Sequence, residues 1–195
     1  MRIAVIKYNA GNIRSVHIAL EHLGIDPIIT DNPTEILQAD KVIFPGVGEA
    51  SSAMKYLKER KLDTLITSLK QPVLGICLGL QLMCNFSEEA NTSCMQIFDT
   101  QVKLFPPEQK VPHMGWNTIT ELKGLLFKNI SDGAYVYFVH SFAAELCNAQ
   151  IAVTNYIYPF AAALQKNNFF ALQFHPEKSG QIGEQILKNF IDLKG

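Results

Sequence analysis

Three residues of the kinds used in nucleophilic catalysis stand out in this 195-residue chain: Cys77, His175 and Glu177. A thiolate can attack a carbonyl carbon, a histidine can carry the proton, and a carboxylate can hold the imidazole in one tautomer. His175 and Glu177 are two positions apart, so in an extended segment both side chains would point to one side, and Pro176 stiffens the backbone between them. An isolated His-x-Glu pair is also common in surface loops. The three residues predict a triad if the fold brings Cys77 to the same place.

The stretch around Cys77 is typical of a strand that turns sharply into a helix. A short apolar run follows Pro72 and ends on the cysteine, which Gly75 and Gly79 flank. At such an elbow the nucleophile sits on a strained backbone, glycines allow close packing, and the helix N-terminus favours the thiolate. Taken alone, the stretch fits a buried packing cysteine equally well. The expected histidine and carboxylate in the same sheet favour the nucleophile.

Four other histidines compete with His175 for the role of base. His140 follows an expected strand and could line the pocket, but no carboxylate lies near it in the sequence, so it ranks second. His113 lies in an expected loop bounded by proline and glycine, where it could serve recognition. His17 and His22 fall on the first expected helix and are interpreted as structural.

A cysteine nucleophile needs N–H donors for the oxyanion that forms during the reaction. The backbone N–H of Leu78, directly after the nucleophile, is one natural donor. The turn that contains Val47 and Gly48 offers a second, because its glycines permit unusual backbone angles and close approach to a substrate. The alternative is that these glycines only shape a strand-to-helix turn.

The elements expected to position these residues alternate between strands and helices in the first half of the chain. Alternation of this kind indicates right-handed βαβ units and a mostly parallel sheet, with sites beyond the carboxyl ends of the strands. Asn12 is expected to cap the first helix. The expected strands are 2–6, 25–30, 42–44 and 73–77, and the expected helices are 13–23, a short one from 33, 49–60, 62–69 and one after Cys77.

The second half is richer in strands. The expected strands are 97, 102–104, 117–119, 135–139, 151–153 and 169–174, followed by a helix over 180–193. No linker or change of composition marks a boundary, so we expect a single domain over residues 1–195. The expected fold is α/β: an open, doubly wound, mostly parallel sheet with helices on both faces and an antiparallel extension.

Composition narrows the class of protein. Hydrophobic residues make up 48% of the chain and charged residues 18%, which suits a globular protein, and a net charge of −1 calls for neither a nucleic acid nor a membrane surface as partner. Residues 3–6 are too short an apolar run for a signal peptide, so none is expected, and the four cysteines form no Cys-x-x-Cys pair. We therefore expect a cytoplasmic protein with no metal site and no cofactor.

Several blocks of the sequence together resemble a known family. Residues 75–81 (GICLGLQ) with His175-Pro176-Glu177 resemble the class I (triad-type) glutamine amidotransferases. Within that class, further blocks are similar to the glutaminase subunits of imidazole glycerol phosphate synthases. These blocks are GNIRSV (11–16), PGVG (45–48), PHMGWN (112–117), YFVHSF (137–142) and QFHPEKS (173–179). They occur in order over nearly the whole chain, which makes the match specific.

The resemblance implies a reaction and a partner. Cys77 would attack the side-chain amide of glutamine, His175 would protonate the departing ammonia and then activate water, and Glu177 would orient His175. Gln81, Ser141 and Phe142 match positions that hold the substrate's amino-acid end. The ammonia would pass to a separate cyclase subunit. The contacts with that subunit implied by the resemblance are Asn12, Trp116, Asn117, Tyr137 and Lys178.

Two positions depart from the family pattern. Lys7-Tyr8-Asn9 replaces Asp-Tyr-Gly, and the segment 93–99 lacks a glycine expected near Gln96. Neither departure touches the triad. Two other interpretations stay open at this point: a glutaminase of another class I amidotransferase, and a non-catalytic module of the same fold.

Overall fold

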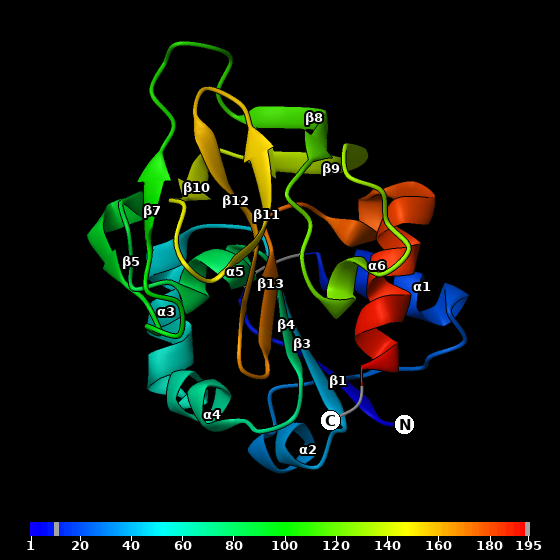
Figure 1. Cartoon of the computed structure of the whole chain (residues 1–195). Coiled ribbons are helices and arrows are strands. Elements are labelled where there is room, and N and C mark those ends of the chain that lie inside the picture. Colours follow the sequence, from blue (N-terminus) through cyan, green and yellow to red (C-terminus); the bar gives the residue numbers. More distant parts are fainter. Residues whose placement is uncertain (10–11, 194–195) are drawn as a thin grey trace.

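The computed structural model describes residues 1–9 and 12–193, so Gly11 of the GNIRSV block lies outside the described residues. Within them, the main sheet has seven strands in the order β11-β12-β13-β4-β3-β1-β2 (Figure 1). The five strands from β13 to β2 are parallel, and β12 and β11 extend the sheet by antiparallel pairing. The strands are β1 (Ile3–Ile6), β2 (Ile28–Thr30), β3 (Lys41–Gly46), β4 (Val73–Cys77), β11 (Gln150–Asn155), β12 (Pro159–Lys166) and β13 (Phe169–Leu172).

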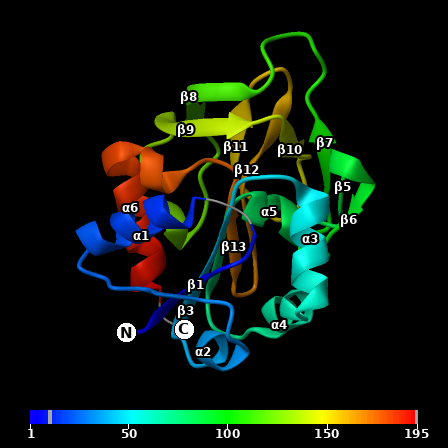
Figure 2. The same cartoon turned by 180° about the vertical axis from the view of Figure 1, so that it is seen from behind.

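Helices cover both faces of this sheet. Figure 2 shows α1 and α6 on one face and α3 and α4 on the other. Along β1, Ile3 and Val5 pack into the core beneath α1 and α6, and Ala4 and Ile6 pack into the opposite core, because successive side chains point to opposite faces. The helices are α1 (Ile13–His22), α2 (Pro33–Leu37), α3 (Ala50–Glu59), α4 (Leu62–Ser68), α5 (Leu78–Met83) and α6 (Gly180–Asp192), with short 3-10 turns η1 (Glu89–Asn91), η2 (Leu125–Phe127) and η3 (Pro176–Lys178). None of the described helices is long and apolar enough to cross a membrane.

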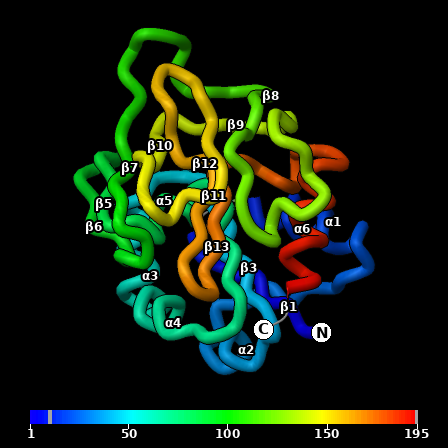
Figure 3. The backbone as a smooth tube through the Cα atoms, viewed as in Figure 1, coloured from blue at the N-terminus to red at the C-terminus, as the bar shows by residue number. Residues whose placement is uncertain are grey.

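Two smaller sheets lie beyond the main one. One has the order β10-β7-β5-β6, and the other is the hairpin-like pair β8-β9, which lies above the carboxyl ends of the parallel strands in Figure 1. The backbone trace in Figure 3 shows the loop of residues 105–112 rising from β7 to reach β8. The strands are β5 (Phe86–Ser87), β6 (Thr92–Ser93), β7 (Gln101–Leu104), β8 (His113–Ile119), β9 (Ala134–His140) and β10 (Phe142–Ala144).

The structure corrects several expected elements. The second strand begins at Ile28 rather than residue 25, because the Ile25 N–H bonds to Leu20 in the end of α1 and Pro27 has no N–H to donate. The expected strand at Ile97 is wrong, since this residue lies in a bend. His113 lies on β8 and not in a loop, and β12 was not expected at all.

Candidate active site

Cys77 lies at the elbow between β4 and α5. Its φ is 53° and its ψ −107°, a strained backbone for a residue with a side chain, and the residue is 6% exposed. A Cβ on Gly79 would overlap the carbonyl oxygen of Phe44, and one on Gly75 would lie 3.0 Å from the backbone of Gly79. The expectation that both glycines allow close packing around the elbow is confirmed.

His175 and Glu177 follow β13, the neighbour of β4 in the sheet. The Nδ1 of His175 lies 2.8 Å from Oε1 of Glu177, and both side chains are fully buried. The extended segment expected here is wrong, because Pro176 begins the η3 turn, yet this turn still brings the carboxylate onto the imidazole. Since a carboxylate accepts, Nδ1 carries the proton. The other ring nitrogen, Nε2, has no hydrogen-bond partner among the described residues.

The surroundings of His175 favour its charged form. Burial alone would lower the pKa of His175, but its interactions with Cys77 and Glu177 outweigh burial and raise the pKa to about 10. A histidine that is cationic at neutral pH beside a cysteine is the arrangement in which a thiolate is stabilised.

Glu177 has a second donor in Asn12. The Asn12 amide donates to the same oxygen, Oε1, at 2.5 Å. Asn12 does occupy the N-cap position of α1, but its φ of 71° and its bond to Glu177 leave no side-chain cap for the helix. The expected N-cap position is therefore confirmed, but the side chain makes no capping bond and its amide holds the carboxylate of Glu177.

Gln173 is a residue near the sulfur that the sequence interpretation missed. Its Nε2 lies 3.7 Å from Cys77 Sγ, and its Oε1 accepts from Gln81 at 3.2 Å. The Gln81 Nε2 also donates to the Phe142 carbonyl at 2.9 Å. The sequence feature that could have identified Gln173 as a site residue is its position two residues before His175.

A pocket of about 180 Å³ opens over Cys77. It suits a ligand the size of one amino acid, since drug-sized ligands occupy about 300–1,000 Å³. The residues expected at the site that line it are Val47, Gly48, Cys77, Leu78, Gln81, Ser141 and Phe142, joined by Glu89, Val139 and His140. Glu89 was not expected here. Its carboxylate accepts from the backbone N–H of Ala50 at 2.7 Å, and burial raises its pKa.

His140 and His113 form a neutral buried pair. The Phe142 carbonyl can only accept, so His140 Nδ1 (2.8 Å away) is the donor and its Nε2 accepts from His113 Nδ1 at 3.0 Å. Burial lowers the pKa of His113 to about 4. Burial, together with smaller effects of the nearby His113 and His175, lowers the pKa of His140 to about 3. Both nitrogens of His140 are thus committed away from Cys77.

The residues that the resemblance implies for partner contacts are split between two environments. Trp116 and Tyr137 pair across β8 and β9 with ring centroids 6.1 Å apart, and Lys178 lies over the Tyr137 ring at 5.8 Å. Asn117 points to the other face of β8, where its amide bonds to His113 and to the Asn155 carbonyl. Met114 and Tyr135 lie on the face of Trp116 and are 56% and 60% exposed.

The departures at residues 7 and 9 lie directly after β1, and their hydrogen bonds are with β2 and α3. The Lys7 N–H donates to the Thr30 carbonyl and so extends the pairing of β1 with β2 by one residue. The side-chain amide of Asn9 donates to the Ser52 carbonyl at 3.2 Å. Neither side chain has a bond to the triad among the described residues.

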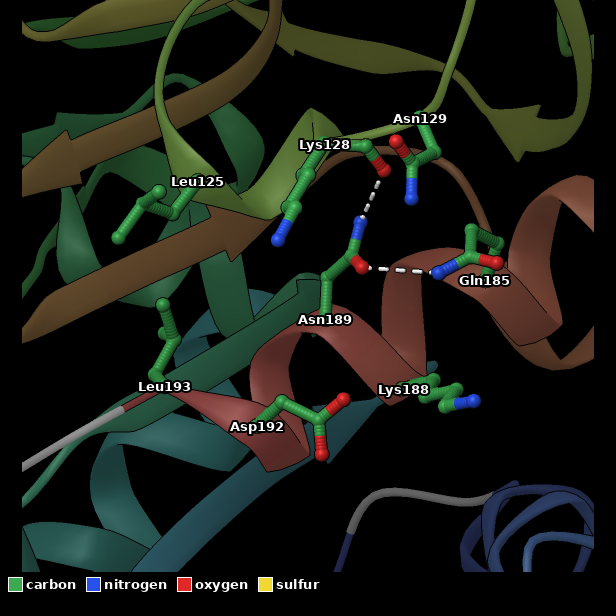
Figure 4. A pocket seen from close by; sticks show the side chains of 8 residues that line it. All are labelled: Leu125, Lys128, Asn129, Gln185, Lys188, Asn189, Asp192 and Leu193. Carbon is green, nitrogen blue, oxygen red and sulfur yellow. Dashed lines mark hydrogen bonds between the residues drawn. The ribbon is translucent and has the colours of Figure 1, made fainter.

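Another hollow, of about 460 Å³, lies between η2 and α6 (Figure 4). Its buried amide, Asn189, donates to the carbonyls of Leu126 and Lys128 and accepts from Gln185. These bonds hold η2 against α6. The buried Asn189 amide therefore has partners within the protein, and its presence here does not require a bound ligand.

Comparison with known proteins decides the family. The family model for class I glutamine amidotransferases matches residues 4–193. The chain belongs to this family. This amidotransferase is 59% identical to the imidazole glycerol phosphate synthase subunit HisH of Bacteroides fragilis (strain YCH46), over 99% of this chain and all of the relative. It is 57% identical, over the same shares, to the subunit of that name from Bacteroides thetaiotaomicron.

Solved structures agree on the fold of this amidotransferase. A putative GMP synthase protein from Thermoplasma acidophilum has a TM-score of 0.74 and 20% identity, over 98% of this chain and 92% of that one. The expected α/β fold, with its mostly parallel sheet and antiparallel strands, is confirmed. The resemblance to the amidotransferase class and its HisH members is confirmed as well.

Proposed function

We propose that this amidotransferase is the glutaminase subunit of an imidazole glycerol phosphate synthase, acting as one domain over residues 1–195 in the cytoplasm. It hydrolyses glutamine to glutamate and ammonia, and the ammonia passes to a cyclase subunit that makes imidazole glycerol phosphate and aminoimidazole carboxamide ribotide in histidine biosynthesis. Its four free cysteines suit a reducing compartment. The full-length likeness to HisH subunits supports the substrate and the partner.

The observation that carries the catalytic proposal is the buried contact of 2.8 Å between His175 and Glu177 beside the strained elbow of Cys77. The thiolate of Cys77 attacks the side-chain amide carbon of glutamine, and the carbonyl electron pair moves to the oxygen. Backbone N–H groups at Val47 or Gly48 and at Leu78 bind this oxyanion. When the intermediate collapses, the C–N bond breaks and His175 gives its Nε2 proton to the departing ammonia.

The second half of the cycle restores the thiolate. His175 takes a proton from water, the hydroxide attacks the thioester carbon, and a second oxyanion forms in the same place. The C–S bond then breaks, and the product leaves as a carboxylic acid that loses its proton to solvent as glutamate. Cys77 is again a thiolate and His175 is again cationic, so one water has been consumed for one ammonia released. Glu177 keeps the Nδ1 proton of His175 in place throughout, with Asn12 holding the carboxylate.

The pocket offers complementary groups for the amino-acid end of glutamine. Both hydrogens of the Gln81 Nε2 are committed to Phe142 and Gln173, so Gln81 contacts the substrate through its oxygen. The Glu89 carboxylate in the same pocket suits the substrate's ammonium group. Ser141 and Phe142 line the same pocket.

The exposed face of β8-β9 is the surface that we propose for the cyclase. Met114, Trp116 and Tyr135 are large, apolar and more than half exposed, and aromatic residues and methionine are enriched in protein interfaces. Val139, at the end of the same face, lines the pocket over Cys77. A partner seated here would lie next to the place where ammonia is released. Lys178 would add a cation at the edge of this surface. Asn12 and Asn117 would contribute indirectly, through their side-chain bonds to Glu177 and to His113.

The test uses the complex with the cyclase and a Cys77→Ala variant. Glutamine-dependent synthesis should be lost, and synthesis from added ammonium salt should survive, because the cyclase is untouched. Glutamine-dependent synthesis that persists in the variant would contradict the catalytic role of Cys77. A glutaminase of another class I amidotransferase would give no synthesis with this cyclase, and a non-catalytic module would release no glutamate from glutamine with the wild-type chain.

A further inference from the structure

Gln173 is a fully buried glutamine whose side chain lies between the nucleophile and a second glutamine. Its Nε2 is 3.7 Å from Cys77 Sγ, and its Oε1 accepts from Gln81 at 3.2 Å. Buried side-chain amides need partners at both ends. The catalytic steps proposed for the triad give Gln173 no task.

A backbone carbonyl determines which end of Gln173 faces the sulfur. The Phe142 oxygen can only accept, so the Gln81 side chain must turn its Nε2 towards it, at 2.9 Å. That same nitrogen donates to Gln173, which must therefore turn its oxygen to Gln81. The N–H of Gln173, and not its carbonyl, is left for Cys77.

We propose that Gln173 donates a hydrogen bond that stabilises the thiolate of Cys77, and that Gln81 positions this donor. The inference rests on the proposed role of Cys77 as nucleophile. A donor that bonds to the charged form of a group favours that form, and a thiolate is a better acceptor than a thiol. Because the amide is neutral and stays in place, it serves both the attacking thiolate and the thiolate that leaves when the thioester is hydrolysed.

The geometry also explains why the donor is an amide and not a second cation. His175 already supplies the cationic partner of the sulfur. A lysine or arginine at position 173 would be buried beside that cation, which is costly. A neutral N–H adds a bond to the sulfur without this repulsion.

The test is the alkylation rate of Cys77 by iodoacetamide against pH, read by mass spectrometry of the Cys77 peptide. The protein is in its complex with the cyclase, and the variants are Gln173→Met and Gln173→Glu. With Gln173→Met the midpoint of the rate profile should move up by about one pH unit, a roughly tenfold slower reaction below the midpoint. Gln173→Glu should slow it further, because a carboxylate would repel the thiolate. The matched control Gln165→Met, on the neighbouring strand β12, should leave the profile unchanged.

Gln81 supplies an independent variant. The side chain in Gln81→Met donates to neither Phe142 nor Gln173, so nothing holds the Gln173 N–H towards the sulfur. Its profile should therefore shift in the same direction as that of Gln173→Met, and the double variant Gln81→Met/Gln173→Met should shift no further than Gln173→Met alone. Additive shifts, or folded Gln173 variants whose profiles match the wild type, would overturn the proposal.

A measurement on the wild-type chain avoids variants of the core. The side-chain amide signals of Gln173 in an NMR titration should move with the ionisation of Cys77, and the movement should disappear in Cys77→Ala. Signals that do not move over the alkylation midpoint would refute the bond. Alkylation and NMR require no glutamine, so they test the bond between Gln173 and Cys77 independently of glutaminase activity. A wild-type complex that releases no glutamate would contradict the proposed function but would not by itself overturn this bond.

Discussion

Glu177→Gln separates the charge of the third triad member from its shape. The Glu177 carboxylate is fully buried and accepts from His175 Nδ1 at 2.8 Å and from Asn12 at 2.5 Å, both at Oε1. Since two N–H groups converge on this oxygen, the introduced amide should also turn its oxygen towards them, which keeps the Nδ1 proton on His175. The variant should then lose the charge and retain the tautomer.

The size of the effect follows from the difference between charged and neutral hydrogen bonds. Bonds to charged groups contribute about 1.5–3 kcal/mol and neutral ones about 0.5–1.5 kcal/mol, so the variant forfeits roughly 1–2 kcal/mol. If this loss falls on the transition state, kcat/KM decreases roughly 5- to 30-fold. The pKa of His175 should fall as well, because Glu177 is one of the groups that raise it to about 10.

The assay is glutamate release by the complex with the cyclase, together with NMR titration of the His175 ring. Glu184→Gln, on the exposed surface of α6, is the matched control and should retain full activity. Adding Asn12→Ala to Glu177→Gln should cost much more activity, because the amide is then free to present its N–H to His175. Unchanged kcat/KM in Glu177→Gln, with the His175 pKa still near 10, would refute this role of Glu177.

Other outcomes follow from the same structure. In Cys77→Ala the pKa of His175 should fall from about 10, since the largest of the interactions that raise it is removed; an NMR titration that still gives about 10 would contradict the pairing. Gln96→Gly should raise the free energy of unfolding in urea by about 0.5–1 kcal/mol, because Gln96 is exposed and its φ of 59° is a left-handed backbone conformation that favours glycine. The control Lys55→Gly, within α3, should lower the free energy of unfolding by about 1 kcal/mol. Trp116→Ala should weaken cyclase binding by about 2 kcal/mol, roughly 30-fold in Kd, and the exposed Leu125→Ala on η2 should not. The free energy of unfolding should fall as the pH drops from about 6.5 towards 4. The pKa of both His113 and His140 is about 6.5 in the unfolded chain but about 4 and about 3 in the folded one, so protonation favours the unfolded chain; the dependence of the unfolding free energy on pH should be weaker in His140→Asn.

The sequence predicted the parallel part of the fold because its signals are local. Apolar runs such as 73–77 and the helices after them follow simple periodicity, and the turns that end β3, β4 and β13 come together because these strands are neighbours. The flanking glycines at 75 and 79 also had a local explanation, the close packing at the elbow, which the structure shows.

What the sequence could not predict depends on long-range pairing. The PHMGWN block, with its proline and glycine, indicated a loop, but pairing with β9 makes it the strand β8. Strand β12, with its run of alanines, shows little β propensity by itself and is held between β11 and β13. The roles of Asn12 and Gln173 come from hydrogen bonds to residues 165 and 96 positions away, which no spacing rule describes.

The central claim is that Cys77 carries the glutamyl group during turnover. The most direct measurement is acid quenching of the complex during steady-state glutamine hydrolysis, followed by mass spectrometry of the Cys77 peptide. We predict a γ-glutamyl adduct on Cys77 that accumulates when hydrolysis of the thioester is slow and is absent in Cys77→Ala. Full glutamate release with the adduct on another residue, or by a Cys77→Ala chain, would contradict this claim.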